Sequence, residues 1–176
     1  MHIDDITALH TRLIEALALK AIPRAGWPRV GVPEHQTESV AAHSWGVAWL
    51  VIALCPSDVD RGRALAIAVL HDLAEARVGD ITPHDNVPKV EKHRLEHAAF
   101  VDLVSALPQR DELIALWMEY ESQSSAEGRF VKACDKLDMA LQAQLYARDH
   151  DADTSELVQA ALAKLTDPLL NALAGR

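Results

Sequence analysis

The sequence predicts an all-α protein, and three observations support that prediction. Alanine and leucine dominate the 176-residue chain, and both residue types favour helix. Apolar residues recur at helical spacing in most segments, and none shows the alternation that is typical of a β-strand. No internal repeat or low-complexity linker divides the chain. We therefore expect one domain over residues 1–176, built from six or seven packed helices.

The first half of the chain is expected to hold three helices separated by loops. The segment 23–37 contains three prolines and two glycines, which indicates a genuine loop. Thr37 stands at the end of this loop and is a suitable N-cap for the helix that follows. Gly79 is expected to end the third helix, because glycine adopts a left-handed cap without strain. The three predicted helices span 4–22, 38–54 and 60–77.

The second half is expected to hold four more helices. The segment 80–86 is rich in Asp, Asn, Thr and Pro, and is predicted to be a second loop. Pro108 divides two helical segments, because proline disrupts a helix interior. The four predicted helices span 88–106, 109–123, 125–148 and 154–173.

The overall charge and the cysteines limit the possible partners and location. The net charge of −9 argues against binding a nucleic-acid polymer, which needs a basic surface. It allows a small anionic substrate, because a bound cation can reverse the local field.

No apolar run approaches the ~20 residues that cross a bilayer, and the early Asp4 and Asp5 are unlike a signal peptide. We expect a cytoplasmic protein without a membrane partner, with Cys55 and Cys134 as buried free thiols.

The dipeptide His71-Asp72 is the strongest indication of chemistry. It directly follows the apolar run 64–70, which is typical of a buried helix. Burying a carboxylate is costly unless a partner offsets the cost, and a metal ion is one such partner. Adjacent helical side chains diverge by about 100°, so both can reach one ion only if the ion lies in a cleft beside the helix. An ordinary helix end near water is the competing interpretation.

Further histidine and aspartate residues could complete a metal site. His43 lies upstream in a helical segment, although a lone histidine is more often a surface or core residue than a ligand. Downstream, either Asp135 or Asp138 could face inward, and the helical period does not choose between them. An ion pair of Asp135 with Lys132 or Lys136 is the simpler alternative. Two imidazoles and two carboxylates would suit a divalent metal that activates water.

Two more carboxylates accompany the dipeptide. Glu75 lies four residues after His71 and three after Asp72, so all three share a helical face. This grouping indicates a polar pocket. Asp80 follows just beyond the predicted helix end. A cap or a surface charge is the competing interpretation for Glu75 and Asp80.

The combined motifs resemble those of the HD-domain metal-dependent phosphohydrolases, and within them the small 5′-deoxynucleotidase group. The resemblance extends over roughly residues 10–146, and implies a single HD domain with the helix 154–173 beyond that core. The motifs that carry it are Pro23-Arg24-Ala25-Gly26-Trp27, the segments 38–45, 71–83, 119–121 and 130–137, and Gln142-Ala143.

The resemblance implies a role for individual residues. Glu75 would position or deprotonate the attacking water, and Asp80 would assist at the nucleotide. Arg24 and Trp27 would hold the phosphate and the sugar, with Trp27 as a wall that excludes a 2′-hydroxyl or, alternatively, an ordinary hydrophobic anchor. Ala42 departs from relatives, which commonly carry an acidic residue there, but this position is not a ligand. The implied metal ligands are His43, His71, Asp72 and Asp135.

The expected function is removal of the 5′-phosphate from (deoxy)nucleoside monophosphates with a divalent ion (Co, Mn, Zn, Fe or Mg). The same ligand pattern serves HD enzymes that act on other phosphate esters or on cyclic or polyphosphate nucleotides. A di-iron oxygenase would need additional histidines, for which His84, His93 and His97 are candidates. A non-catalytic scaffold that holds a structural metal is the remaining alternative.

The resemblance also implies a homodimer, because relatives are commonly dimers. The sequence does not show the interface. Trp45 and Trp49 share one helical face in an apolar segment, and we expect both to pack in the core.

Overall fold

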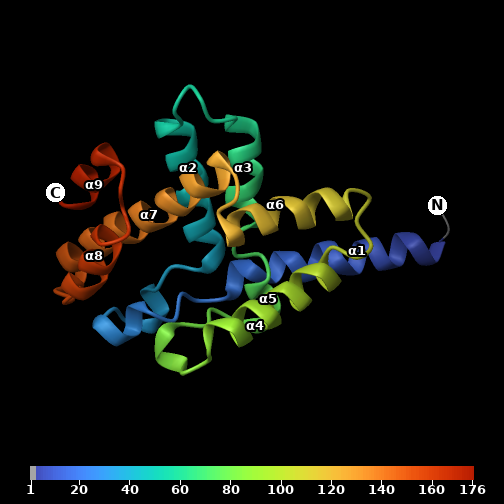
Figure 1. The fold of residues 1–176 in the computed structure, drawn as a ribbon. Helices are drawn as coiled ribbons and strands as arrows, with labels where there is room; N and C mark the ends of the chain where they lie inside the picture. Colours follow the sequence, from blue (N-terminus) through green and yellow to red (C-terminus); the bar gives the residue numbers. More distant parts are fainter. Residues whose placement is uncertain (1–2) are drawn as a thin grey trace.

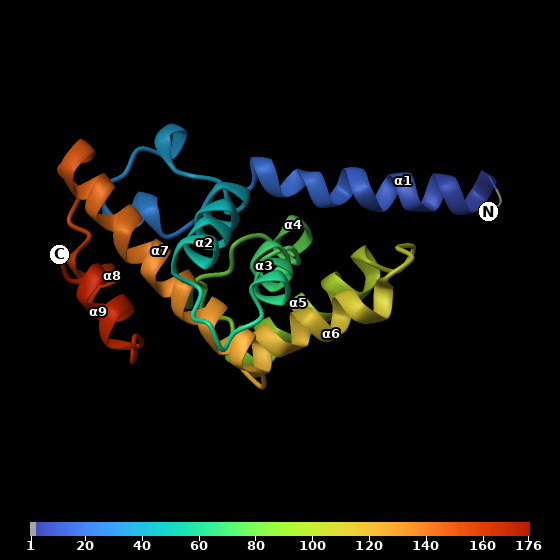
Figure 2. The ribbon, with the colours of Figure 1, turned by 90° about the horizontal axis from the view of Figure 1, so that it is seen from above.

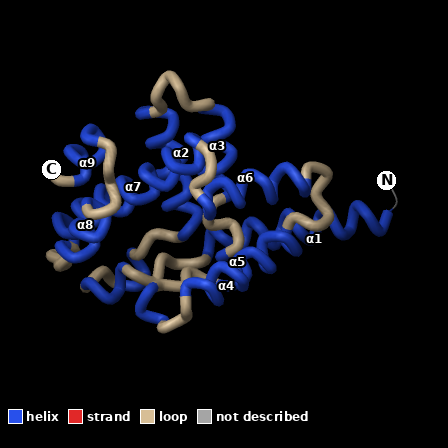
Figure 3. The backbone as a smooth tube through the Cα atoms, in the orientation of Figure 1, coloured by secondary structure: helices blue, strands red, loops and turns tan. Residues whose placement is uncertain are grey.

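The fold is all-α, as predicted, in a computed structural model that describes residues 3–176. Within that range the chain forms nine α-helices and four short 3₁₀-helices, and no strand (Figures 1 and 3). The 3₁₀-helices are Ala18–Ala21, Trp27–Val30, Glu34–Gln36 and Pro83–Asp85. The α-helices are α1 Ile3–Leu17, α2 Val40–Leu54, α3 Arg61–Leu70, α4 Glu75–Val78, α5 Lys89–Leu103, α6 Arg110–Ser122, α7 Ala126–His150, α8 Ser155–Leu162 and α9 Pro168–Ala174.

The long helix α7 is the centre of the packing. It contacts α2, α3 and α6 on one side, and α8 and α9 on the other (Figure 2). The core between these helices is formed by fully buried apolar side chains, among them Val47, Ile67, Trp117 and Leu137. This packing brings residues of α2, the end of α3 and α7 to one place, although they are far apart in the sequence.

The predicted continuous helix 60–77 is wrong, because the chain turns between α3 and α4. The carbonyl of His71 accepts a hydrogen bond from Trp117 Nε1 of α6 at 3.2 Å, which holds the turn from outside the segment. His71 and Asp72 therefore lie where the helix has just ended, and both side chains can face one point. Gly79 then ends α4 with φ 75° and ψ 171°, a positive-φ conformation but not the left-handed cap that was predicted.

Two other helix boundaries differ from the prediction. The N-cap of α2 is Ser39, whose side chain accepts a hydrogen bond from the Ala42 amide, and not Thr37. The Thr37 hydroxyl instead donates to the Pro33 carbonyl at 3.3 Å. The predicted helix 154–173 is divided into α8 and α9, because Asp167 caps a new helix that begins with proline.

The loop 23–37 is anchored beside the start of α2. Pro23 and Ser39 form an antiparallel bridge, in which the Arg24 amide donates to the Glu38 carbonyl at 2.9 Å. The Val40 amide also donates to the Ile22 carbonyl at 2.8 Å. This bridge holds Arg24 close to the helix that carries His43.

Helix α1 extends away from the bundle and buries none of its described residues (Figure 2). Arg77 of the short helix α4 connects it to the body through ion pairs with Glu15 of α1 and Asp102 of α5. The exposed apolar side chains of α1 are Ile3, Ile6, Leu13, Ile14 and Leu17.

Two other sequence expectations need correction. Trp45 and Trp49 are 72% and 54% exposed, so neither packs in the core. The apolar helix α2 buries its opposite side. Cys55 and Cys134 are both free thiols, but only Cys134 is buried, because Cys55 lies half-exposed at the end of α2. Among the described residues, no helix combines the length and apolar character needed to cross a membrane.

Candidate metal centre

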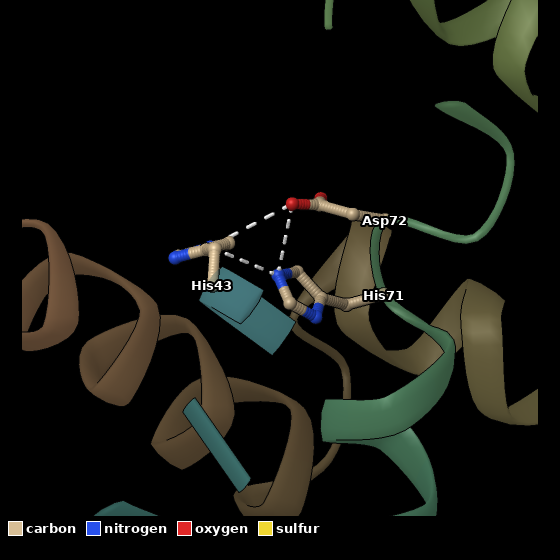
Figure 4. Close-up of side chains that lie close together, drawn as sticks. All are labelled: His43, His71 and Asp72. Carbon is tan, nitrogen blue, oxygen red and sulfur yellow. Dashed lines mark hydrogen bonds and ion pairs between the residues drawn. The ribbon is translucent and has the colours of Figure 1, made fainter. Parts of the chain in front are cut away.

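Three predicted ligands converge at the junction of α2 and the end of α3 (Figure 4). Nε2 of His43 and Nε2 of His71 lie 3.4 Å apart. Oδ2 of Asp72 lies 3.1 Å from Nε2 of His71 and 3.6 Å from Nε2 of His43. These three atoms come from two segments of chain and point toward one another.

Each imidazole is oriented by its other nitrogen. Nδ1 of His71 donates to the Ala68 carbonyl at 2.8 Å, and Nδ1 of His43 donates to Oδ2 of Asp138 at 2.7 Å. Such bonds fix the tautomer of a metal-ligating histidine and leave the Nε2 lone pair for the ion. The side chains of both histidines are 0% exposed, so their orientation is also held by packing.

Asp135 and Asp138 both face inward, on opposite sides of His43. Oδ1 of Asp135 lies 3.5 Å from Nε2 of His43, on the side of the other donors. Its Oδ2 accepts a hydrogen bond from Tyr120 at 2.7 Å and an ion pair from Lys136 at 2.9 Å. Asp138 contacts Nδ1 of His43, which the sequence did not reveal, although its i+3 spacing from Asp135 indicates a shared face of α7.

Gly46 is part of the same arrangement. A Cβ atom at this position would overlap the Asp138 carboxylate, so this position of the Asp138 carboxylate is compatible only with glycine at residue 46.

Glu75 lies at the start of α4 and is only 4% exposed. Its Oε2 is buried and has no hydrogen-bond partner within the described part of the chain. Burial, together with the negative charges of Asp72 and Asp80, raises the pKa of Glu75 to about 10. An unpartnered buried carboxyl of this kind indicates that the site is completed by a cation or a ligand.

The electrostatics of the cluster favour a positive ion. Burial raises the pKa of Asp72, but the charges of His71, His43 and Arg24 outweigh burial and lower it. Burial and Arg24 lower the pKa of His43, yet hydrogen bonds to Asp135 and Asp138 raise it to about 9. The surrounding carboxylates thus favour a positive charge at this point, and in the absence of a metal ion a proton on His43 supplies it.

Arg24 and Asp80 lie at the edge of the cluster. Nη1 of Arg24 is 3.4 Å from Oδ2 of Asp72, and its Nε is 4.0 Å from Oδ2 of Asp80. The same Asp80 oxygen accepts a hydrogen bond from the Ala25 amide at 2.8 Å, which ties the loop to the segment after α4. The structure therefore brings both residues to the site.

Trp27 is 2% exposed and packs inside the loop region. Its ring contacts Tyr146 edge-on at 5.0 Å, and its Nε1 donates to Glu38 at 2.9 Å. These contacts correspond to the anchor interpretation of Trp27, whereas its contact with a sugar stays a prediction.

The residues present fit a divalent metal ion. Donor atoms bound about 2.0–2.2 Å from one ion lie roughly 3.0–3.5 Å apart. The three donors of His43, His71 and Asp72 have separations close to this range. Asp135 lies 3.5 Å from Nε2 of His43 but outside this close group of three. Mixed imidazole and carboxylate donors suit Mn, Fe, Co or Zn.

A cavity of about 230 Å³ opens beside the centre and is lined by His71, Asp72, Glu75 and Tyr120, among others. His93 also lines it but pairs with Glu121 at 2.9 Å. In the part of the chain that the structure describes, neither His93 nor His97 belongs to a group of donors close enough to share an ion. The oxygenase alternative gains no support from this geometry.

Comparison with known proteins identifies similar sequences and structures. Residues 16–173 match the family described as HD domain. The chain is 44% identical over 130 residues to 5′-deoxynucleotidase HDDC2 of Homo sapiens, which covers 73% of this chain and 63% of the human protein. It is 40% identical over 141 residues to 5′-deoxynucleotidase hdd1 of Schizosaccharomyces pombe, covering 77% and 70% of the two chains.

Two solved structures are similar over most of their length. A conserved hypothetical protein from Pyrococcus furiosus superimposes with a TM-score of 0.75 at 36% identity, covering 88% of each chain. A predicted metal-dependent phosphohydrolase from Magnetospirillum magnetotacticum gives a TM-score of 0.73 at 27% identity, covering 97% of this chain and 89% of the other.

Proposed function

Because the chain belongs to the HD domain family, we propose that it is a metal-dependent phosphohydrolase that removes the 5′-phosphate from nucleoside and 2′-deoxynucleoside monophosphates. The observation that carries the proposal is the convergence of His43, His71 and Asp72 beside the buried, unpartnered carboxyl of Glu75. The names of the human and yeast relatives support the substrate class.

We propose that His43, His71, Asp72 and Asp135 hold the divalent ion. When bound, such an ion would lower the pKa of a coordinated water and polarise a phosphoryl oxygen. Asp138 and the Ala68 carbonyl keep the two imidazoles in the ligating orientation. Tyr120 and Lys136 hold one oxygen of Asp135, which leaves the other oxygen directed at the centre.

Glu75 is proposed as the general base. Its carboxyl lines the cavity beside His71 and Asp72, and its Oε2 has no competing partner in the described chain. A neighbouring positive charge favours the carboxylate form, which can accept a proton at Oε2 from the attacking water. A base in this position typically contributes about 10²–10⁴-fold to the rate.

Arg24 is proposed to bind the phosphate, with Asp80 as the group that positions it. The guanidinium is held between Asp72 and Asp80, and an edge of a planar guanidinium suits bidentate contact with phosphate oxygens. Trp27 closes the neighbouring loop, and we propose it as the wall beside the sugar. A Trp27→Ala variant that still discriminates dAMP from AMP as the wild type does would remove that role.

The test is phosphate release from a panel of substrates. The protein is stripped with a chelator and reloaded with Co²⁺, Mn²⁺, Zn²⁺, Fe²⁺ or Mg²⁺, and a His71→Ala/Asp72→Ala variant is the control. The panel holds 5′-nucleotides, 2′-deoxynucleotides, a cyclic dinucleotide and a guanosine polyphosphate. Metal-dependent release from monophosphates supports the proposal. Turnover of only the cyclic dinucleotide or the guanosine polyphosphate would assign the enzyme to a different phosphate substrate. No turnover of any substrate with metal bound would favour the non-catalytic scaffold.

We further propose that the protein is a homodimer that associates through α1. This helix buries none of its described residues, yet it exposes five large apolar side chains on one face. A self-complementary apolar face of this kind is typical of a two-fold interface.

A cytoplasmic location is also proposed, and the two free cysteines are compatible with a reducing compartment.

A further inference from the structure

A second, larger cavity lies next to the metal centre and carries only positive charge. Its volume is about 670 Å³, and its walls come from the segment 81–89, α5, α7 and the segment between α8 and α9. No Asp or Glu lines it. We call it the lysine cavity, and its six cationic side chains are Lys89, Lys92, Arg129, Lys132, Lys136 and Lys164.

The concentration of charge is unusual for this chain. The protein has 17 Lys and Arg against 26 Asp and Glu, yet six of those 17 cations line one cavity without an acidic neighbour in the lining. Like charges held together raise the free energy of the folded state unless an anion balances them. Lys89, Arg129 and Lys164 are exposed, so an anion from solvent can reach them, and the concentration of positive charge favours such an anion.

Three of the six cations have no carboxylate partner. Within the described chain, no Asp or Glu lies within 4.0 Å of the charged groups of Lys89, Lys164 or Arg129. Arg129 donates only to the backbone carbonyls of Gln123 and Ser124. Repulsion from Lys136, followed by burial, lowers the pKa of Lys164. Lys164 is thus close enough to the other lysines of the cavity for their charges to disfavour its own.

The remaining three cations have partners within the protein, and two of these partners belong to the metal centre. Lys136 pairs with Asp135, and Lys132 contacts the Tyr120 hydroxyl at 2.9 Å. Lys92 donates to the Ile81 carbonyl at 2.6 Å and lies 3.4 Å from Glu96. Lys89, Lys92 and Lys132 also line the smaller cavity beside His71, so the two cavities are neighbours.

We propose that the lysine cavity binds a small anion that carries a chain of phosphate groups, as in tripolyphosphate or a nucleoside triphosphate. Several closely spaced cations match several closely spaced phosphates better than they match one. The volume lies within the range of small-molecule sites, about 300–1,000 Å³. The lining also offers the hydroxyls of Thr82 and Thr166 and the apolar side chains of Ile81, Pro83 and Val87, against which a base can pack.

A nucleic-acid strand is the alternative occupant, and the overall charge disfavours it. A strand extends beyond one cavity, and the rest of the protein has an excess of negative charge that repels a polymer. A small polyphosphate contacts only the cavity.

Binding is measured by calorimetry on chelator-treated protein at about 0.1 M salt, where a neighbouring charge is screened over about 10 Å. The ligands are tripolyphosphate, ATP, adenosine and a single-stranded DNA oligonucleotide. The test variant is Lys89→Gln/Lys164→Gln, which changes the two unpaired lysines. The matched control is Lys20→Gln, an exposed lysine that does not line the cavity.

We expect tripolyphosphate and ATP to bind, adenosine not to bind, and the double variant to bind at least about tenfold more weakly. The control should bind as the wild type does. Tighter binding of ATP than tripolyphosphate would identify a nucleotide as the ligand, and equal binding would identify the phosphate chain alone. Equal affinity in the double variant, or no binding of either ligand to the wild type, would overturn the proposal, as would a preference for the oligonucleotide.

One further control separates this site from the metal centre. A His71→Ala variant should retain the affinity for tripolyphosphate in the presence of chelator. Loss of binding in that variant alone would assign the anion to the metal centre and overturn the separate site. The proposal concerns binding without metal, so its failure leaves the proposed hydrolysis unaffected, and the failure of hydrolysis leaves this measurement unaffected.

Discussion

Gly46 of α2 leaves the space that the carboxylate of Asp138 occupies on α7. That carboxylate accepts the Nδ1 hydrogen of His43 at 2.7 Å. A residue without a side chain, three positions after His43, thus permits the contact that orients this proposed metal ligand.

Replacing Gly46 with alanine tests this arrangement. The new Cβ would displace the Asp138 carboxylate, and His43 would lose its orienting bond. Loss of such a contact typically lowers metal affinity by about 10–100-fold. Metal affinity is measured by competition with a coloured chelator. Gly62→Ala is the matched control, because its Cβ would meet nothing closer than 3.4 Å. Unchanged affinity in Gly46→Ala would show that Asp138 does not orient the ligand.

Replacing Glu75 with glutamine tests the general base. Glutamine has nearly the same shape, so the fold and the bound metal should be retained. Turnover of a nucleoside monophosphate should fall by about 10²–10⁴-fold, because the amide cannot accept a proton from water. Phosphate release and metal content are measured on the same sample. Full activity at full metal content would remove Glu75 from the mechanism.

Metal loading should raise the stability of the folded chain. An ion that binds only the folded state at 100 times its Kd adds about 2.7 kcal/mol to the free energy of unfolding. Chelation should therefore lower the unfolding temperature of the wild type. The His71→Ala variant should not respond to either treatment. A response of the variant equal to that of the wild type would place the ion elsewhere.

The contacts of Arg77 predict a pH-dependent stability. A hydrogen bond to Arg77 lowers the pKa of Glu15, and the same arginine lowers the pKa of Asp102. A lowered folded-state pKa stabilises the protein above the unfolded-state value, and this stabilisation is lost as the pH falls through the folded-state value. Arg77→Gln should cost about 1 kcal/mol or less at pH 7, because Asp102 is 55% exposed, and less than that at pH 3, which lies below the ordinary pKa of both carboxyls.

Urea denaturation at the two pH values measures this difference. Arg148→Gln is the control, because Arg148 pairs only with its exposed neighbour Asp149. An equal loss of stability at pH 7 and pH 3 would mean that Arg77 acts by packing and not by charge.

The proposed dimer predicts an effect of charge on one face of α1. Leu13→Glu places a carboxylate among the exposed apolar side chains and should halve the mass measured by light scattering. Ala8→Glu lies on the opposite side of the helix, is also exposed, and should leave the mass unchanged. A monomeric wild type, or equal masses for all three proteins, would contradict the proposal.

Only the local part of the candidate site could be predicted from residue spacing. His71 and Asp72 are adjacent, and an apolar run before them indicates that their position is buried. The turn after Leu70 could not be predicted, because Trp117 stabilises it from 46 residues away. The helical period of α7 did not decide which of Asp135 and Asp138 faces inward. The structure shows why, because both face inward and contact different nitrogens of the His43 imidazole.

The exposure of Trp45 and Trp49 has a similar explanation. An almost wholly apolar helix has no polar stripe that marks its outer face, so the sequence does not indicate which side packs against α3 and α7. The division of the last predicted helix at Asp167 was missed for a different reason. The segment is helical on both sides of the break, and only the Asp-Pro pair marks it.

The single turn of α4 faces two parts of the molecule at once. Glu75 points into the centre, and Arg77, two residues later, holds α1 and α5 from outside. One helical turn thus carries both the contact to α1 and the carboxylate that is proposed to receive the proton. If subunits associate through α1, as proposed, the interface lies one helical turn from the general base. Association would then affect the position of Glu75 without any contact with the substrate.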